Sequence, residues 1–283
     1  MTSATSLSQE LVRPLRDLAA WTEHFRRSQI PVLRETVEAL DALRVNEERT
    51  DANSIGEMIG GDPLMTLKVL AYASDHRGRS VVTGPETVIA ALVMMGIPPF
   101  FRAFVAPVTI EDWLAASPEA LAGLESVLDR AHRGARFALA FAIHRTDPHA
   151  ATIHAAALLH EFAEMLLWCH APRLALRIRE LQDADPTLRS SVAQRTILQI
   201  DLDDLQQALV AAWRLPVLLS ETSREPHAGN TGARTVALAA RLARHTAGGW
   251  DNAAVPDDIA EVAAFLNLSP GAALDLMRAV DAK

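Results

Sequence analysis

Several residue types that often reveal a protein's chemistry are scarce in this chain. Its single cysteine, Cys169, excludes an internal disulfide framework and is typical of a reducing compartment. Lys68 and Lys283 are the only lysines, and arginine supplies the remaining basic side chains. With 27 Lys and Arg against 35 Asp and Glu, the net charge is −8. This balance argues against DNA or RNA as the main partner, because phosphate neutralisation needs a basic face.

Long hydrophobic runs are absent as well. No apolar stretch reaches the ~18 residues needed to span a bilayer, so we expect no membrane association. Residues 1–10 are polar and contain no hydrophobic run after a basic start, which argues against a signal peptide. We therefore expect a cytoplasmic protein. Only 5% of the 283 residues are aromatic, so the core must be built from Leu, Ala, Val and Ile.

The apolar residues repeat with a helical period along almost the whole chain, and no segment alternates with period two. The sequence therefore predicts an all-α fold. We expect helices over these segments: Pro31–Leu43, Ile55–Ile59, a helix starting at Pro63, Pro85–Met95, Pro118–His144, Asp147–His170, a helix starting at Pro172, Ile200–Arg214, Thr231–Thr246 and Asp257–Ala282.

One helix start is especially clear. Asp62 can accept hydrogen bonds from the free amides as N-cap, and Pro63 suits the first helical position, where its missing N–H costs nothing. Gly96 is a stop signal for the helix that precedes it.

Prolines between Ile97 and Pro118 indicate a boundary between two subdomains. We divide the chain into four parts: a leader with the start of the first helix (1–20), an N-terminal helical subdomain (21–107), a second helical subdomain (108–249) and a C-terminal helical extension (250–283).

The most informative stretch is A-A-A-L-L-H-E-F-A-E-M-L-L at 155–167. An apolar helix there carries His160 followed at once by Glu161. The zinc motif H-E-x-x-H does not apply, because Glu164 stands where its second histidine should be. Cys169 beside His170 defines no nucleophile–base pair, and a buried, inert cysteine is the simpler interpretation.

Five landmarks occur in a characteristic order: Ile30-Pro31-Val32-Leu33; Ile59-Gly60-Gly61-Asp62-Pro63-Leu64 with Leu67-Lys68-Val69-Leu70; Val88-Ile89-Ala90-Ala91-Leu92 with Met95-Gly96; His160-Glu161; and Trp213-Arg214-Leu215-Pro216. Over residues 29–248 the chain thereby resembles the HDOD family, which comprises non-catalytic relatives of the HD and HD-GYP phosphohydrolases in bacterial signalling proteins. The resemblance implies an HD-superfamily-like helical bundle with an N-terminal helical subdomain, no catalytic residues, no cofactor and no metal. It assigns structural roles to these motif residues: Pro31, Asp62, Pro63, Leu64, Gly96, Trp213 and Pro216.

An active HD site gathers histidines and aspartates around metals that polarise a phosphate and activate water. The resemblance makes the following residues remnants of such a site: His132, His160, Glu161, Asp201 and His227. Glu161 is one methylene longer than the expected aspartate, and Asp201 stands where relatives often carry a histidine. No aspartate occurs near residues 242–246, where His245 is found instead.

Two interpretations of these remnants stay open. His132, His160 and Glu161 could form a residual metal site, or the two histidines could be packed between helices with Glu161 or Glu164 as partner. The second interpretation is favoured, because Arg136 lies one helical turn from His132 and would repel a cation.

Three arginines one turn apart, Arg130, Arg133 and Arg136, could bind a phosphate or cyclic dinucleotide, or could form a solvated face paired with acids. We expect a non-catalytic signal-transduction module that acts by protein–protein interaction in two-component or cyclic di-GMP signalling. Its expected partner is a kinase, a response regulator or a cyclic di-GMP enzyme. The alternatives are a residual metal-dependent phosphohydrolase or phosphodiesterase, and a sensor of anions or nucleotides.

Overall fold

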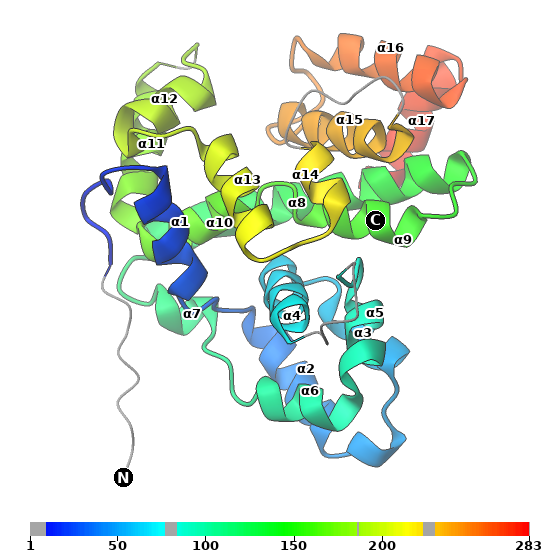
Figure 1. Ribbon diagram of the computed structural model, residues 1–283. Helices are drawn as coiled ribbons and strands as arrows, with labels where there is room; N and C mark the ends of the chain where they lie inside the picture. The colour runs from blue at the N-terminus through cyan, green and yellow to red at the C-terminus, as the bar shows by residue number, and fades with distance from the viewer. Residues whose placement is uncertain (1–9, 77–83, 186, 223–229, 283) are drawn as a thin grey trace.

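The structure is a computed structural model that describes residues 10–76, 84–185, 187–222 and 230–282. The chain forms a smaller N-terminal lobe and a larger lobe that contains the rest of the helices (Figure 1). Within the described residues the only β feature is an isolated parallel bridge between Val32 and Thr109. The prediction of an all-α fold is therefore confirmed.

The smaller lobe consists of short helices: α2 (Arg34–Arg44), the 3-10 turn η1 (Glu47–Arg49), α3 (Ala52–Ile59), α4 (Pro63–Asp75), α5 (Val88–Met95) and α6 (Ile97–Ala103). α4 packs against α5 within this lobe and contacts the larger lobe through α10. The segment between α4 and α5 includes residues 77–83, which lie outside the described residues.

The remaining helices are α1 (Leu18–Arg27), α7 (Ile110–Trp113), α8 (Pro118–His144), α9 (Ala150–Leu158), α10 (Phe162–His170), α11 (Pro172–Ala184), α12 (Ser190–Leu198), α13 (Leu202–Ala212), α14 (Val217–Thr222), α15 (Thr231–His245), α16 (Val255–Leu266) and α17 (Pro270–Asp281). Although the sequence groups most of α1 with the N-terminal subdomain, α1 packs against α13 of the larger lobe. Its side chains Trp21 and Phe25 are fully buried.

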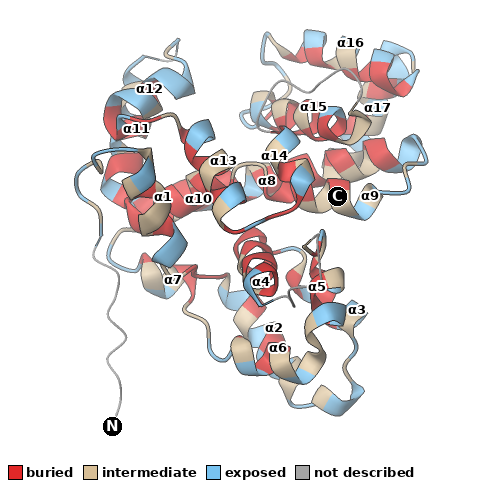
Figure 2. Ribbon diagram, in the orientation of Figure 1, coloured by how far each residue is buried: buried red, intermediate tan, exposed pale blue. Residues whose placement is uncertain are grey.

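Helix α8 is the centre of the larger lobe and begins and ends where the sequence predicts. It packs against α9, α10, α15 and α17, and its inward side chains are buried along nearly its whole length (Figure 2). A Cβ built on Gly134 would lie 3.6 Å from the Ala240 Cα, at ordinary van der Waals contact, so the crossing of α8 and α15 leaves room for small residues only. Small residues at this crossing therefore set the close distance between the two helices.

The start of α4 confirms the expected cap. Asp62 Oδ1 accepts a hydrogen bond from the Met65 amide at 2.9 Å, and Pro63 occupies the first helical turn. Asp62 Oδ2 also accepts from the Leu33 amide at 2.8 Å, which ties α4 to the start of α2. The carboxylate is only 1% exposed. One side chain thus caps a helix and joins two elements.

The bounds of several predicted helices differ from the structure: the helix expected from Pro31 begins only at Arg34, and the one expected from Ile55 already begins at Ala52. Two further differences have an identifiable cause. The helix expected from Pro85 begins only at Val88, because the Thr87 hydroxyl caps it by accepting from the Ala90 amide. The helix expected from Asp147 to His170 is divided into α9 and α10, with His160 and Glu161 in the break. Both corrections arise from side-chain contacts to the backbone that override helical periodicity.

The C-terminal extension is an integral part of the larger lobe. Buried side chains of α16 and α17 join the same hydrophobic core as α8 and α15; they are Val262, Ala263, Phe265, Leu266, Ala273 and Met277. Among the described helices, none is by itself long and apolar enough to cross a membrane. Only α16 and α17 taken together have that length and composition, and they meet at a bend of 101°.

Candidate functional site

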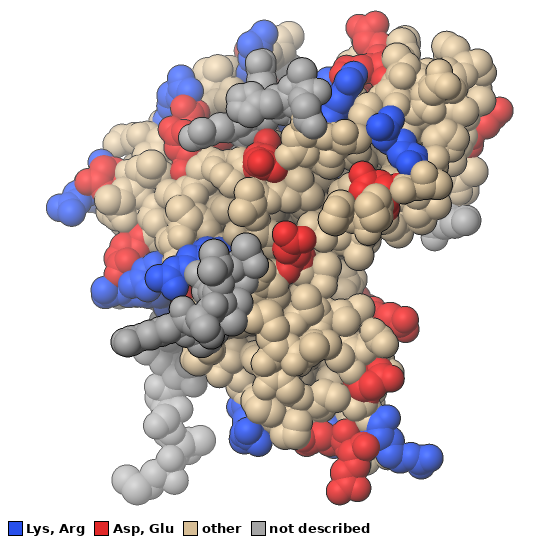
Figure 3. All heavy atoms as spheres, turned by 45° about the vertical axis from the view of Figure 1, so that its right-hand side comes forward, with Lys and Arg blue, Asp and Glu red and all other residues tan. Residues whose placement is uncertain are grey.

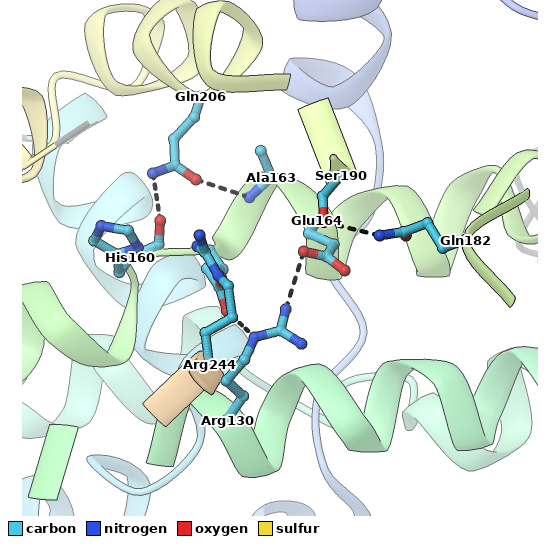
Figure 4. Close-up of polar contacts among 9 residues, drawn as sticks. Arg130, His160, Ala163, Glu164, Gln182, Ser190, Gln206 and Arg244 are labelled. Carbon is cyan, nitrogen blue, oxygen red and sulfur yellow. Dashed lines mark hydrogen bonds and ion pairs between the residues drawn. The ribbon is translucent and has the colours of Figure 1, made fainter. Parts of the chain in front are cut away.

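His160 and Glu161 occupy the turn between α9 and α10. The Gln206 side chain on α13 makes hydrogen bonds to backbone groups of this turn and of the start of α10. Helix ends leave backbone groups without intrahelical partners. Gln206 Nε2 donates to the His160 carbonyl at 2.6 Å, and its Oε1 accepts from the Ala163 amide at 3.3 Å (Figure 4). Because Gln206 is only 5% exposed, one buried amide satisfies the end of α9 and the start of α10.

Glu161 lies between two guanidinium groups that come from different helices. Arg130 on α8 donates from Nε to Glu161 Oε2 at 2.6 Å, and Arg244 on α15 donates from Nη2 to Oε1 at 2.8 Å. Arg130 also donates from Nη2 to Glu164 Oε2 at 3.0 Å (Figure 4). The Arg130 and Glu161 side chains are 18% and 12% exposed. Both oxygens of Glu161 are therefore taken by cations of the chain itself.

The electrostatics of this cluster follow from its burial. Burial alone would raise the pKa of Glu161, but the charges of Arg130 and Arg244 outweigh burial and lower that pKa to about 2. Burial raises the pKa of the Glu164 carboxyl, and the negative charge of neighbouring Glu161 raises it further. The positive charge of Arg130 acts in the opposite direction but does not outweigh them. Burial likewise raises the pKa of Asp203, which faces His160 and Arg244 from α13. Glu161 is thus held ionised by the two arginines.

The His160 side chain borders the same cluster in an uncharged state. Burial lowers the pKa of its imidazole. Its Nδ1 atom is buried and has no hydrogen-bond partner among the described residues. The cavity beside it measures about 10 Å³ and is lined by small residues together with Arg130, His160 and Glu161. This volume corresponds to roughly one water molecule, so the site is closed to substrates of the size of a phosphate ester.

The other expected remnants lie elsewhere. His132 Nε2 bonds to the Gly61 carbonyl of the N-terminal lobe, and Asp201 forms an ion pair with Arg195 at the start of α13. His245 pairs with Asp258 of α16 at 2.6 Å. His227 lies outside the described residues. Of the four predicted remnants that the structure describes, it therefore brings together only His160 and Glu161.

Comparison with known proteins now identifies the family. The chain matches the HDOD domain over residues 30–228. It belongs to the HDOD family. The crystal structure of the MmoQ response regulator from Methylococcus capsulatus str. Bath is similar with a TM-score of 0.67 and 17% identity, over 89% of this chain and 99% of that one. A virulence factor from Campylobacter jejuni subsp. jejuni has a TM-score of 0.64 and 18% identity, over 87% and 89%. No curated protein sequence matches significantly.

The residues of this HDOD protein do not fit the metal that HD hydrolases use. Across the described residues, no three His, Cys, Asp or Glu side chains come together as metal ligands would. Glu161 already accepts from two guanidinium groups, and a divalent cation placed beside them would be repelled. The donor set thus supports neither a metal nor a reaction step that depends on one.

The three arginines for which an anion site and an acid-paired face were both left open do not converge in this HDOD domain. Arg130 pairs with Glu161 and Glu164. Arg133 instead forms a two-point ion pair with Asp281 of α17, with Nε to Oδ1 at 2.7 Å and Nη2 to Oδ2 at 2.8 Å. Arg136 has a buried Nε without a hydrogen-bond partner among the described residues. Two of the three positive charges are therefore neutralised inside the fold.

Sequence reasoning missed Arg244, Gln206 and Asp203 as members of the site. Arg244 lies within residues 242–246, the segment in which an aspartate is expected but missing. A basic residue in that segment, together with Arg130 just before the first expected histidine, was the sequence signal that could have indicated arginine partners for Glu161. No pattern in the sequence indicates Gln206, because its role depends on how α13 packs over the turn.

Proposed function

We propose that this HDOD protein is a non-catalytic signal-transduction module that acts by binding another signalling protein. The observation that carries the proposal is the pair of guanidinium groups on Glu161. They supply positive charge where a hydrolase would bind a metal, and the remaining space admits about one water molecule. Because this site has no room for a substrate, we infer that the protein acts through contacts made by the surfaces of its helices.

Similar proteins support the signalling context. The MmoQ structure is described as a response regulator, and its chain is matched over almost its full length. We infer by analogy a partner of the same kind: a kinase, a response regulator or a cyclic di-GMP enzyme. The acidic net charge of −8 is compatible with a protein partner and unfavourable for nucleic acid.

Metal content and hydrolysis test the non-catalytic part. The protein is purified, incubated with manganese, iron or zinc, desalted and analysed for metal, and then assayed on a phosphomonoester and on cyclic di-GMP. We expect far less than one equivalent of metal and no turnover. About one equivalent of a metal that is lost in Glu161→Gln, together with hydrolysis that is also lost, would establish the phosphohydrolase instead.

Partner binding tests the signalling part. Tagged protein captures proteins from the source cells, and each candidate is then purified and titrated against the wild type and His160→Ala. We expect a signalling enzyme or regulator to bind with a defined stoichiometry. His160→Ala should lower stability through lost packing while affinity stays within about twofold. Failure of every purified candidate to bind would count against the proposal.

A further inference from the structure

Helix α5 has no polar face. Its eight residues, VIAALVMM, are all apolar. One side packs into the core of the N-terminal lobe through Val88, Ala91 and Leu92. A helix that is apolar all round is normally enclosed on every side. The opposite side of α5 is open instead, with Ile89, Val93 and Met94 exposed by 38%, 71% and 45%.

These three exposed side chains, called the α5 face below, form a continuous and well-supported surface. Ile89 and Val93 are four residues apart, which places them in line along the helix. Gly56 of α3 has no side chain, and Ile89 packs into the space that a Cβ there would need. Because α5 is thus seated on α3, the α5 face is held in place before any partner arrives.

Carboxylates border the α5 face. Glu86 lies two residues before the start of α5, and its Oε2 accepts a hydrogen bond from the Thr152 hydroxyl at 3.2 Å. Glu57 follows Gly56 on α3, and both glutamates are exposed. From the side of α3 and α5, the N-terminal lobe shows a largely uncharged middle, with acidic side chains along its right-hand edge and both acidic and basic side chains at its lower end (Figure 3). An apolar surface with an acidic rim selects a partner with the opposite rim charge.

We propose that the α5 face is the docking site for an amphipathic helix of a partner protein, with an apolar stripe flanked by Arg or Lys. The inference rests on the proposed function and names the surface that carries it. A helix laid on such a surface buries its stripe at i, i+3, i+4 and i+7. A second copy of this chain is disfavoured, because two-fold pairing of the α5 face would gather the Glu57 and Glu86 carboxylates of both copies around one apolar contact.

The test uses two designed helical peptides of about 18 residues, each with the same Leu and Met stripe. One carries Arg on both flanks and the other carries Glu at the same positions. Binding is measured by fluorescence anisotropy on the full chain. We expect the Arg peptide to bind at least about tenfold more tightly than the Glu peptide.

Variants assign the binding to the α5 face. Val93→Gln should weaken binding of the Arg peptide about tenfold, the loss expected for one aliphatic side chain at an interface. Glu57→Lys should reduce the preference for Arg flanks. The matched control is Val192→Gln on α12 in the larger lobe, where the replaced valine is 47% exposed. It should leave affinity unchanged. The melting curve of Val93→Gln should match the wild type, because this side chain is largely in solvent.

Three results would overturn the inference: equal affinity for the two peptides, unchanged affinity in Val93→Gln, or a dimer in light scattering that Val93→Gln abolishes. The last result would assign the face to self-association. A fourth result, a purified signalling partner that binds Val93→Gln as tightly as wild type, would also refute the α5 docking site while leaving the proposed function intact. Hydrolytic activity, in contrast, would refute the proposed function without affecting the peptide result.

Discussion

At the scale of single residues, the ion pairs around Glu161 involve charges that solvent screens only partly. Arg130 contacts two carboxylates and is mostly buried, whereas Arg195 pairs with Asp201 while 64% exposed. Removing one partner of a buried pair leaves an uncompensated charge, and the same change at the surface costs little.

We therefore expect Arg130→Ala to lower the free energy of unfolding by about 2–4 kcal/mol. Arg130→Lys should recover only part of this loss, because an ammonium group cannot reproduce the planar contacts to both Glu161 and Glu164. Arg195→Ala is the control and should cost at most about 1 kcal/mol. Urea denaturation measures all three, and equal losses for Arg130→Ala and Arg195→Ala would show that burial does not strengthen the cluster.

Asp62 and Asp51 offer a comparison between two helix caps. Both accept from an amide of their helix, but Asp51 is exposed and Asp62 is buried with a second bond from Leu33. Asp51→Ala should cost about 1 kcal/mol, as an ordinary N-cap does. Asp62→Ala should cost about 2–4 kcal/mol, because two buried donors lose their acceptor. A urea midpoint for Asp62→Ala no lower than that of Asp51→Ala would contradict this.

His170 makes stability depend on pH. Burial, with a smaller contribution from His24, lowers the pKa of His170 to about 3, against 6.5 for an ordinary histidine. The unfolded chain therefore binds more protons between these values, and stability falls as the pH drops below 6.5, by up to about 1.4 kcal/mol per unit. His170→Phe keeps an aromatic ring beside Phe25 and Trp113 and should remove this part of the slope. Urea unfolding at pH 7.5 and 5 compares the two proteins, and parallel slopes would disprove the assignment.

At the scale of elements, the break between α9 and α10 depends on Gln206. Gln206→Ala leaves the His160 carbonyl and the Ala163 amide without this partner and should cost about 2–3 kcal/mol. The control is Gln207→Ala, which removes bonds to Ser220 in a half-buried position and should cost about 1 kcal/mol or less. If chemical denaturation ranks the two variants in the opposite order, Gln206 does not hold the break.

The same elements show what the sequence can predict. Local signals sufficed for α8 and for the Asp62 cap, because proline, aspartate and apolar spacing act within a few residues. The break at His160 could not be predicted, because its cause is a side chain more than forty positions later in the chain. His160 and Glu161 were recognised as neighbours, but their partner Arg244 becomes visible only once α15 crosses α8.

At the scale of the whole molecule, the C-terminal extension is fastened to the central helix. Arg133 of α8 binds Asp281 at two points and also donates to the carbonyl and hydroxyl oxygens of Thr246, while Trp250 Nε1 donates to Asp281 at 3.1 Å. The C-terminal extension is thus joined to the fold by both its core residues and its last helical turn.

Asp281→Ala should accordingly lower the free energy of unfolding by about 1–3 kcal/mol, because the mostly buried Arg133 loses its carboxylate. Asp275→Ala on the exposed side of the same helix should change it by less than about 0.5 kcal/mol. Thermal unfolding of both variants measures the difference, and an unaltered midpoint in Asp281→Ala would mean that apolar packing alone holds α17.

The two arginines on Glu161 also determine whether the stability of the fold depends on ions in the surrounding solution. A metal ion comes from solution, so a protein that needs one gains or loses stability with the free metal concentration and with chelators. Arg130 and Arg244 are part of the chain and are present in every molecule at every moment. The stability of this site is therefore independent of the metal concentration in the cell, and the site cannot act as a metal sensor.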